Sequence, residues 1–565
     1  MAAPQHQPSM HNLERAVSHG VVQHHLSPEE EITFPQLTQG GEHTDAYLET
    51  SPTGLVRADE AEAAVSPVTS RTQGRRGSHS TLVGGAGSGK AILDLEKQNQ
   101  MIDAKLVTWK ENDSENPRNW SNMQKWVQTI IPTALCWLSG FGSSVVTGGL
   151  PEMAEHYHVS ELVMNLIVCV FVIGFGVGPM LLSPLSEMYG RRFIYIGCTW
   201  LYFILTLPGC LTDSMAVMVI FRFFAGCAAS ACMCNAAGSI GDLWEVNARG
   251  NKMAAFSATI FAAPCLGPLI GGYLTLCTGW RNLWWCLFAT CGFFALVSTI
   301  FLRETYAPTL LKNRAAKLRK ETGDVMIMTE QERQGRPLSE VAKETLLRPV
   351  VMLTTEAIMM CFSGYLMLVY SLLYSLFFAY PIVFVGNHGF NSGEVGLTFL
   401  SVFIGIMIAC IVAMPLQEAY YQRQVVKHNG HPPPEARLPL MMVSCLVLPA
   451  AEFIFAATSI RSVHWSGALV SGIPFGFSLV GIYTSANTYI AVAFSEYSAS
   501  AMAAKTLARS LAGASIPMWL QPMYSSIGNL WAGMTFAFIS LVMCPIPFVF
   551  FMYGAKIRSR SKMAS

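Results

Sequence analysis

A short string occurs twice in this chain of 565 residues: residues 184–189 read PLSEMY, and residues 415–420 read PLQEAY. Each copy follows a long apolar run, and the two copies occupy corresponding loops in the two halves of the sequence. Duplication of one multi-helix unit, with both copies in parallel orientation, would leave a match of this kind. The repeat therefore predicts a fold that is built from two equivalent halves.

Long apolar runs surround both copies. Between Lys125 and Phe551 the chain alternates between short polar loops and apolar runs of roughly 18 to 25 residues, the length that spans a bilayer. Twelve runs can be assigned, the seventh with an interfacial end: 125–149, 162–182, 193–211, 215–238, 253–275, 282–302, 350–385, 394–415, 438–460, 466–491, 500–524 and 530–553. We therefore predict an all-α membrane protein with twelve transmembrane helices in two six-helix halves.

The composition agrees with a membrane protein. Apolar residues make up 52% of the chain and charged residues 13%, about half of the ~25% that is usual in soluble proteins. The formal net charge of +1 gives no basic field for nucleic acid. All 15 cysteines lie after residue 135, mostly inside apolar runs, and this placement excludes a secreted disulfide scaffold.

Composition also sets the expected domain boundaries. Residues 1–124 are rich in His, Ser, Thr, Gly, Glu and Gln, and we predict that they form a disordered cytosolic tail. The N-terminal six-helix half is predicted at 125–302, a cytosolic central loop at 303–349, and the C-terminal half at 350–553. Residues 554–565 are predicted to form a second cytosolic tail.

Two patterns in the predicted N-terminal tail imitate binding sites. Residues 84–90 read GGAGSGK, which matches the GxxxxGK of a phosphate-binding loop, but Ala91 stands where Ser or Thr would hold magnesium. His24 and His25 lack a fixed scaffold for a metal. We therefore predict no nucleotide, no metal and no cofactor. We also expect no enzyme activity, because no nucleophile–base set occurs on a predicted helix.

Lysine and arginine residues are distributed unequally between the two sides of the predicted bundle. If the N-terminus is cytosolic, the outside loops carry only Arg281 and Arg461, whereas the inside loops and the central loop are rich in cations, among them Arg249, Lys252 and Arg437. Cytosolic loops carry the excess of Lys and Arg in membrane proteins. The asymmetry therefore predicts that both termini are cytosolic.

Three strings carry a resemblance to a known family. Residues 115–121 read ENPRNWS, residues 176–179 read GVGP, and residues 183–192 read SPLSEMYGRR. Over about residues 107–561 the chain resembles the major facilitator superfamily, specifically the fungal twelve-helix drug:proton antiporters of the branch that includes polyamine exporters. The resemblance implies two six-helix bundles around a central cavity.

The resemblance assigns the loop at 183–192 to gating between inward and outward states. Gly190 permits a tight turn, Glu187 can accept hydrogen bonds from helix N-termini, and Arg191 and Arg192 fit the cytosolic boundary. Glu187 replaces the usual Asp of the family, and Ser183 replaces a usual Gly. Two positive-inside arginines beside a turn are the alternative interpretation.

Charged residues within the predicted helices are candidates for proton coupling. Arg222 lies about 12 Å deep in the fourth helix, at 1.5 Å per residue, and the resemblance links it to coupling. The alternative is an interfacial arginine whose side chain reaches the membrane surface. Glu356 and Glu452 lie in the seventh and ninth helices, and each could carry a proton or lie near a membrane face.

The fifth predicted helix contains GPLIGG at residues 267–272, which resembles the segment that characterises antiporters within the superfamily. Gly267, Gly271 and Gly272 would let helices approach closely, and Pro268 would supply a bend. Helix packing alone is the alternative, because GxxxG is common in membrane helices.

Aromatic residues are candidates for the substrate cavity. Four of them share one face of the seventh helix: Tyr370, Tyr374, Phe377 and Phe378. Such a face can contact a planar or cationic ligand, or it can pack against other helices. Asn487 and Arg509 fit the family pattern near the eleventh helix. Val492 stands where relatives usually have Asp, which weakens the case for a polyamine-like substrate.

The resemblance thus implies proton-coupled efflux of a small organic molecule, such as a secondary metabolite, drug or toxin, across a fungal cell membrane. The expected partners are the substrate, protons and the lipid bilayer, not nucleic acid or nucleotide, and we expect a monomer. Vacuolar, vesicular and peroxisomal membranes stay open as locations. Two functional alternatives also stay open: a polyamine or organic-acid transporter that works by uptake or uniport, and a transporter-like sensor.

Overall fold

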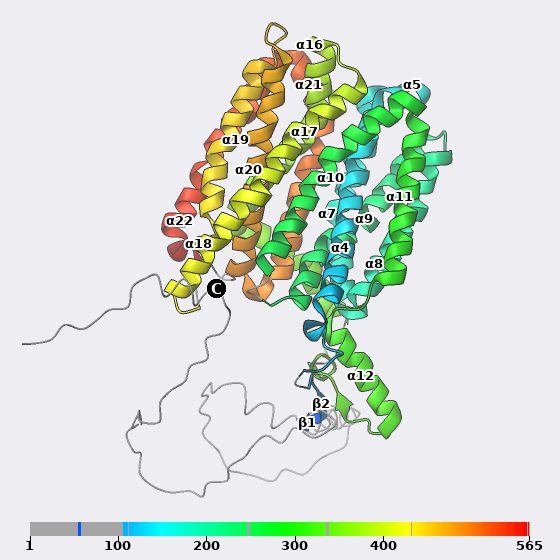
Figure 1. Cartoon of the computed structure of the whole chain (residues 1–565), viewed down its shortest axis with the longest axis vertical. Helices are drawn as coiled ribbons and strands as arrows, with labels where there is room; N and C mark the ends of the chain where they lie inside the picture. The colour runs from blue at the N-terminus through cyan, green and yellow to red at the C-terminus, as the bar shows by residue number, and fades with distance from the viewer. Residues whose placement is uncertain are drawn as a thin grey trace, which may run out of the picture. The chain divides into compact units, whose positions relative to one another are not determined.

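The computed structural model describes residues 55–57, 105–110, 112–245, 249–334, 338–430, 432–561 and 563. Almost all of these residues belong to helices (Figure 1). The GGAGSGK string, His24 and His25 lie outside the described residues, as does most of the predicted N-terminal tail.

Six long helices form the N-terminal half: α4 (Asn122–Ser144), α7 (Leu166–Tyr189), α8 (Arg191–Leu211), α9 (Met215–Leu243), α10 (Arg249–Thr278) and α11 (Trp280–Phe301). The short elements η2 (Val145–Gly149), α5 (Leu150–His156) and α6 (Glu161–Met164) connect α4 to α7. The Ser121 hydroxyl accepts a hydrogen bond from the Gln124 N–H and so caps α4.

The C-terminal half contains the remaining long helices: α14 (Leu338–Thr355), α15 (Ala357–Tyr380), α17 (Ser392–Ile408), α18 (Met414–Lys427), α19 (Pro439–Thr458), α20 (Trp465–Ala493), α21 (Ser498–Met543) and α22 (Pro545–Arg558). Short elements lie between them: η4 (Pro381–Val385), α16 (Gly386–His388), η5 (Ala409–Ala413), η6 (Pro434–Arg437) and η7 (Ser495–Tyr497). The π-helical turn η5 joins α17 and α18 into one continuous membrane crossing.

Helix α21 contains parts of two membrane crossings. Gly528 has φ 78°, a left-handed conformation that glycine adopts readily, and it breaks the helix. The apolar segment Ser500–Arg558 has 59 residues and would measure about 88 Å as one straight helix, nearly three times the ~30 Å hydrocarbon core. The eleven apolar segments found among the described residues therefore make twelve crossings, as predicted.

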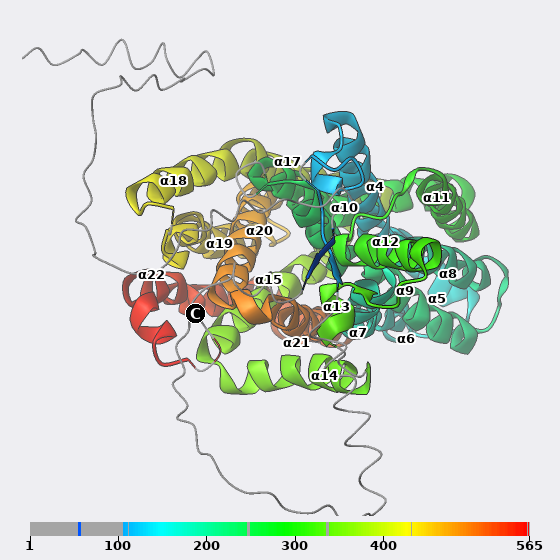
Figure 2. The same cartoon turned by 90° about the horizontal axis from the view of Figure 1, so that it is seen from below.

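The crossings divide into two bundles, which are best seen along the helices (Figure 2). Helix α7 packs against the first part of α21, and α10 packs against α17. These two helix pairs form the seam between the halves, and each pair joins one helix from each half. The predicted fold of two six-helix halves is confirmed.

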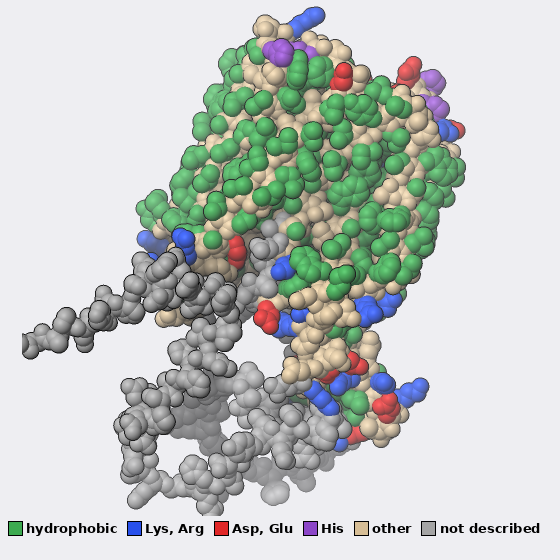
Figure 3. Space-filling model, in the orientation of Figure 1, with side chains coloured by type: hydrophobic (Ala, Val, Ile, Leu, Met, Phe, Trp, Pro, Cys, Tyr) green, Lys and Arg blue, Asp and Glu red, His purple; other side chains and the backbone are tan. Residues whose placement is uncertain are grey.

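An apolar belt covers the face of the bundle drawn in Figure 3, and charged side chains gather at the two ends of this face. We call the end that carries α12 (Ala307–Thr322) and the C-terminus the basic end, and the end that carries α5 and α16 the far end (Figure 1). At the far end, Arg281 forms an ion pair with Asp213, which also contacts His156. The belt and the apolar helices show a multi-pass membrane protein.

Part of the predicted tail is folded. Strand β2 (Lys105–Val107) pairs antiparallel with β1 (Leu55–Arg57) and parallel with β3 (Ile327–Met328) of the central loop. Val107 and Ile327 pack with Ala315 of α12 in a small core. Residues 105–110 and 112–121 of the predicted tail are thus described by the structure, because the apolar side chains of β2 find partners in the central loop.

Ion pairs hold this folded segment to the central loop. Lys105 lies 2.8 Å from Asp324, and Arg314 lies 2.5 Å from Asp113. Burial opposes ionisation of Asp113, but hydrogen bonds from the Arg314 side chain and the Glu115 N–H outweigh burial and lower its pKa. Asp113 is therefore ionised, as its ion pair requires.

Candidate functional site

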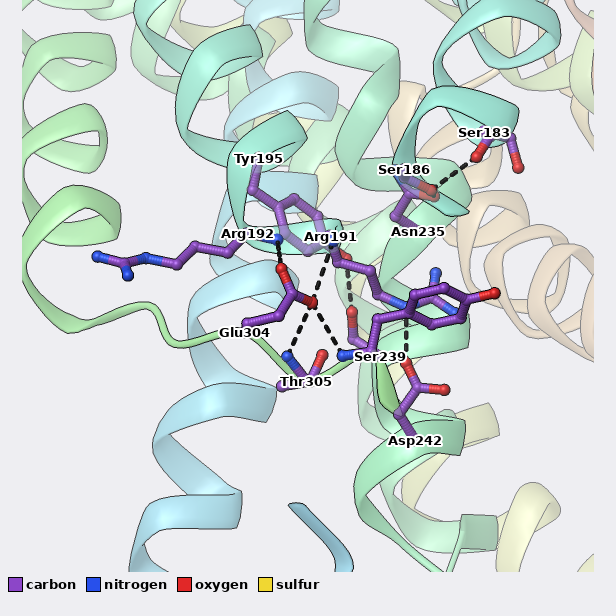
Figure 4. Close-up of polar contacts among 11 residues, drawn as sticks. Ser183, Ser186, Arg191, Arg192, Tyr195, Asn235, Ser239, Asp242, Glu304 and Thr305 are labelled. Carbon is purple, nitrogen blue, oxygen red and sulfur yellow. Dashed lines mark hydrogen bonds and ion pairs between the residues drawn. The ribbon is translucent and has the colours of Figure 1, made fainter. Parts of the chain in front are cut away.

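The predicted gating loop is a tight turn between α7 and α8 at the basic end (Figure 4). Gly190 has φ 95°, and a side chain at this position would collide with the carboxylate of Glu304. That carboxylate accepts hydrogen bonds from the backbone N–H groups of Arg191 (3.1 Å) and Arg192 (3.0 Å). An acidic group at a helix N-terminus accepts hydrogen bonds from N–H groups that have no partner within the helix. Its negative charge also interacts favourably with the positive end of the helix dipole.

Glu304 therefore performs the capping that we predicted for Glu187. The Glu187 side chain is exposed. Glu304 also accepts hydrogen bonds from the N–H groups of Thr305 and Tyr306, which fixes the start of the central loop against α8. Sequence reasoning missed this role because Glu304 follows the sixth helix, far from the loop in the sequence.

The two arginines of the loop differ in their contacts. The Arg191 side chain is buried, and its Nε donates to Asp242 of α9 over 2.6 Å, while its guanidinium lies 5.1 Å from the Tyr306 ring centroid. The Arg192 side chain is exposed and points away from the cluster (Figure 4). The loop thus ties α7, α8 and α9 to the start of the central loop through Arg191 and Glu304.

Arg222 of α9 is buried inside the N-terminal half, with 3% of its surface exposed. Its Nη2 donates to the Gly142 carbonyl of α4 over 3.0 Å, and its Nε donates to the Ile167 carbonyl of α7 over 3.3 Å. The guanidinium also stacks 4.1 Å from the Phe171 ring centroid. Arg222 is therefore not an arginine that reaches the membrane surface, and it forms no ion pair with a described carboxylate.

The glycine-proline segment of α10 packs against two different parts of the protein. Side chains at Gly267 and Gly271 would collide with Ser144 and Val145 of the same half. On its other side, α10 meets α17 of the opposite half. A Cβ at Gly396 would lie 2.6 Å from the Pro268 carbonyl oxygen, and one at Gly272 would collide with the Ser392 carbonyl. The segment thus combines packing within one half with a close approach between the halves.

A second seam contact, formed by cationic and aromatic residues, lies mainly on the C-terminal half. The Arg509 guanidinium of α21 stacks 4.4 Å from the Tyr370 ring centroid and 5.3 Å from that of Tyr483. Lys505 lies one turn earlier, 5.2 Å from the Tyr483 ring, and donates to the Asn487 side-chain oxygen. We call Tyr370, Tyr374, Tyr483, Asn487, Lys505 and Arg509 the cationic cluster.

The cationic cluster reaches both halves. The Tyr374 hydroxyl donates to the Ser143 hydroxyl of α4 over 3.2 Å, and Tyr483 meets the Phe261 ring of α10 edge-on at 4.8 Å. Both Lys505 and Arg509 are buried, with 4% and 3% of their surface exposed. A buried cation within a membrane protein marks a functional position because its desolvation is costly.

The structure thus brings four predicted cavity residues together: Tyr370, Tyr374, Asn487 and Arg509. Phe377 packs on Phe399 of α17 with ring centroids 5.4 Å apart, and Phe378 is buried as well. Sequence reasoning missed Lys505 and Tyr483. Both could have been found by helical spacing, because Lys505 precedes Arg509 by four residues and Tyr483 precedes Asn487 by four.

The two acidic candidates lie in different places. Glu452 of α19 has 5% of its surface exposed, and it makes no hydrogen bond or ion pair within the part of the chain that the structure describes. Glu356 is the N-cap residue of α15, is also buried, and accepts a hydrogen bond from the Ser561 hydroxyl of the C-terminal segment. Glu356 therefore lies at the start of its helix, and Glu452 lies within its helix.

Comparison with known proteins agrees with this architecture. Residues 133–517 match the Major Facilitator Superfamily. The chain is 39% identical to the major facilitator superfamily multidrug transporter mdrA of Aspergillus fumigatus, over 81% of this chain and 76% of the relative. It is 33% identical to polyamine transporter 3 of Saccharomyces cerevisiae, over 94% of this chain and 88% of the relative.

A solved structure shares the fold. The proton:xylose symporter XylE superposes with a TM-score of 0.56 at 15% identity, over 77% of this chain and 96% of that chain. The matching family and its relatives show that a chain with this fold is a membrane transporter of small molecules. The chain therefore belongs to the Major Facilitator Superfamily, within the branch of fungal drug and polyamine transporters.

Proposed function

We propose that this protein exports a small aromatic organic molecule in exchange for protons, with its basic end in the cytosol. The observation that carries the proposal is the cationic cluster at the seam. Any movement that separates the halves near the cluster changes the contacts of Tyr374 with Ser143 and of Tyr483 with Phe261. A ligand bound there would therefore interact differently with the inward and outward states, as coupled transport requires.

The chemistry of the cluster favours an aromatic anion over a polyamine. Lys505 and Arg509 repel a cationic substrate and attract a carboxylate, a sulfonate or a phenolate. The tyrosine rings offer faces for stacking on a planar group. Val492, which stands at a position where an acidic residue would suit a polyamine, agrees with this preference.

Glu452 is the residue that we assign to the transported proton. An ionised carboxylate within a membrane helix costs about 2.5–3.5 kcal/mol, so Glu452 should hold a proton whenever water is excluded. Exposure to water on one side would release the proton. We assign to Glu356, which accepts a hydrogen bond from the Ser561 hydroxyl at the basic end, a second role in proton coupling. To Arg222 we assign a positioning role, because it donates to backbone carbonyls of α4 and α7.

Vesicles with an imposed pH gradient test the direction of coupling. We expect vesicles with an acidic interior to accumulate naphthalene-2-sulfonate, a permanent anion, but not spermidine, while valinomycin and potassium hold the membrane potential at zero. A protonophore should abolish the accumulation. Accumulation only with an acidic exterior would indicate symport, and equilibration without any gradient dependence would indicate uniport. Absence of transport under every gradient would favour a sensor.

Arg509→Gln should weaken the interaction with the anionic probe. A hydrogen bond to a charged group contributes about 1.5–3 kcal/mol, so the probe concentration for half-maximal transport should rise about tenfold to a hundredfold. Arg461→Gln is the matched control, because Arg461 is exposed at the far end and should leave this concentration unchanged. An unchanged value for Arg509→Gln would remove Arg509 from the proposed site.

Reporter mapping tests the proposed orientation. We expect tags after residue 565 and within the central loop to be accessible from the cytosol, and a tag beside Arg461 to be accessible only from the opposite side. The physical reason is the excess of lysine and arginine at the basic end. The same tagged protein, imaged in cells, would distinguish the cell membrane from vacuolar, vesicular and peroxisomal membranes. A central-loop tag outside the cell would contradict the orientation.

A further inference from the structure

A groove of about 280 Å³ lies on the side of the N-terminal half, where α4, α10 and α11 meet. Its wall includes the apolar residues Ile130, Ala134, Trp137 and Phe294. Two large apolar side chains at the groove are exposed on the surface of the bundle: Ile130 by 57% and Trp126 by 40%. The groove therefore opens sideways toward the membrane rather than toward the cationic cluster.

The length of the groove corresponds to one membrane leaflet. Trp126 lies near the start of α4, and Trp137 lies eleven positions further along the same helix. At 1.5 Å per residue these two groove residues are about 16 Å apart along the axis, close to half of the ~30 Å hydrocarbon core. A single acyl chain that lies in the groove would therefore extend from the headgroup level to the middle of the bilayer.

Two lysines mark the end of the groove that faces the basic end: Lys252 lines the groove, and Lys125 directly precedes the lining residue Trp126. The Lys252 ammonium lies 4.4 Å from the Trp244 ring centroid and 5.6 Å from the Trp126 ring centroid. The Lys125 ammonium lies 5.6 Å from the Trp244 ring. Neither lysine forms an ion pair with a described residue. Stacking on the indoles fixes their positions and leaves their charge available to an anion.

We propose that this groove binds one anionic diacyl phospholipid, with the phosphate and carboxylate of the headgroup at Lys125 and Lys252 and one acyl chain along α4. Charge complementarity argues for an anionic headgroup, and the apolar wall argues for an intact lipid rather than a soluble phosphate. The inference uses the proposed orientation, because anionic lipids are concentrated in the cytosolic leaflet. It does not depend on the transported substrate.

Native mass spectrometry of the full chain tests the proposal. The protein is reconstituted with equal amounts of phosphatidylserine and phosphatidylcholine and then extracted into detergent. The lipids that stay bound are identified from the mass of the complex. We expect one phosphatidylserine per chain to be retained in preference to phosphatidylcholine. Soluble glycerophosphoserine should not compete at the same concentration, since it lacks the acyl chain. Equal retention of the two lipids would overturn the proposal, and so would a mass of two chains without lipid.

Two variants separate the headgroup from the acyl chain. The double variant Lys125→Ala/Lys252→Ala should bind phosphatidylserine about tenfold to thirtyfold more weakly, because each cation contributes to binding near an anionic surface. Lys312→Ala/Lys317→Ala, two exposed lysines of α12, should leave retention unchanged. Ala134→Phe fills the groove and should lose the lipid while keeping the thermal midpoint of the protein. Retention by the first double variant equal to that of the wild type would also overturn the proposal.

Discussion

Glu452→Gln is expected to abolish proton-driven accumulation while substrate exchange persists. Glutamine has the shape of protonated glutamate but cannot release a proton. A gradient of about two pH units supports up to about hundredfold accumulation for one exchanged proton, since one unit corresponds to about 1.4 kcal/mol. In Glu452→Gln this ratio should fall to about one. Exchange of labelled for unlabelled naphthalene-2-sulfonate, which needs no net proton movement, should stay within about twofold of the wild type.

Glu394→Gln provides the matched control for this experiment. Glu394 lies in the first turn of α17, where its carboxylate accepts the Asn391 N–H at 2.8 Å and its side chain is exposed. Because glutamine can keep this hydrogen bond, the control should retain the full accumulation ratio. If Glu452→Gln also retained full accumulation, the transported proton would be carried elsewhere, and Glu356→Gln would become the decisive variant.

The fold could be predicted almost completely from the sequence because membrane helices need long apolar runs. The twelve runs and the repeated string at 184–189 and 415–420 indicated two halves of six helices, and the structure has them. The pairing of strand β2 with the central loop could not be predicted. Strand β2 has only three residues, and its partner β3 lies more than two hundred residues away in the central loop. A short strand whose partner is remote leaves no periodic pattern.

The candidate site was predictable only in part. Helical spacing placed Tyr370 and Tyr374 on one face, and the structure brings this face to Arg509. Spacing within one helix does not show which other helix covers the face, so the contacts with Ser143 and Phe261 across the seam could not be predicted. The same limit applies to Glu304, whose contact with the start of α8 joins segments more than one hundred residues apart.

Arg222→Ala is expected to abolish proton-driven accumulation, with substrate binding at least partly retained. The arginine holds carbonyl groups of two helices, Gly142 on α4 and Ile167 on α7, and Gly142 precedes the Ser143 that contacts Tyr374. Each hydrogen bond lost from this charged donor costs about 1.5–3 kcal/mol. The variant should therefore also lower the thermal midpoint, because α4 and α7 lose their common donor next to the seam.

Arg222→Lys distinguishes positioning from charge. Lysine keeps the positive charge, but it lacks the planar fork with which arginine reaches both carbonyls. We expect partial recovery of accumulation and of the thermal midpoint relative to Arg222→Ala. Accumulation of naphthalene-2-sulfonate, equilibrium binding and the thermal midpoint should be measured for both variants at matched expression, with Arg281→Ala as the far-end control. Full accumulation by Arg222→Ala would show that Arg222 joins α4, α7 and α9 without any part in coupling.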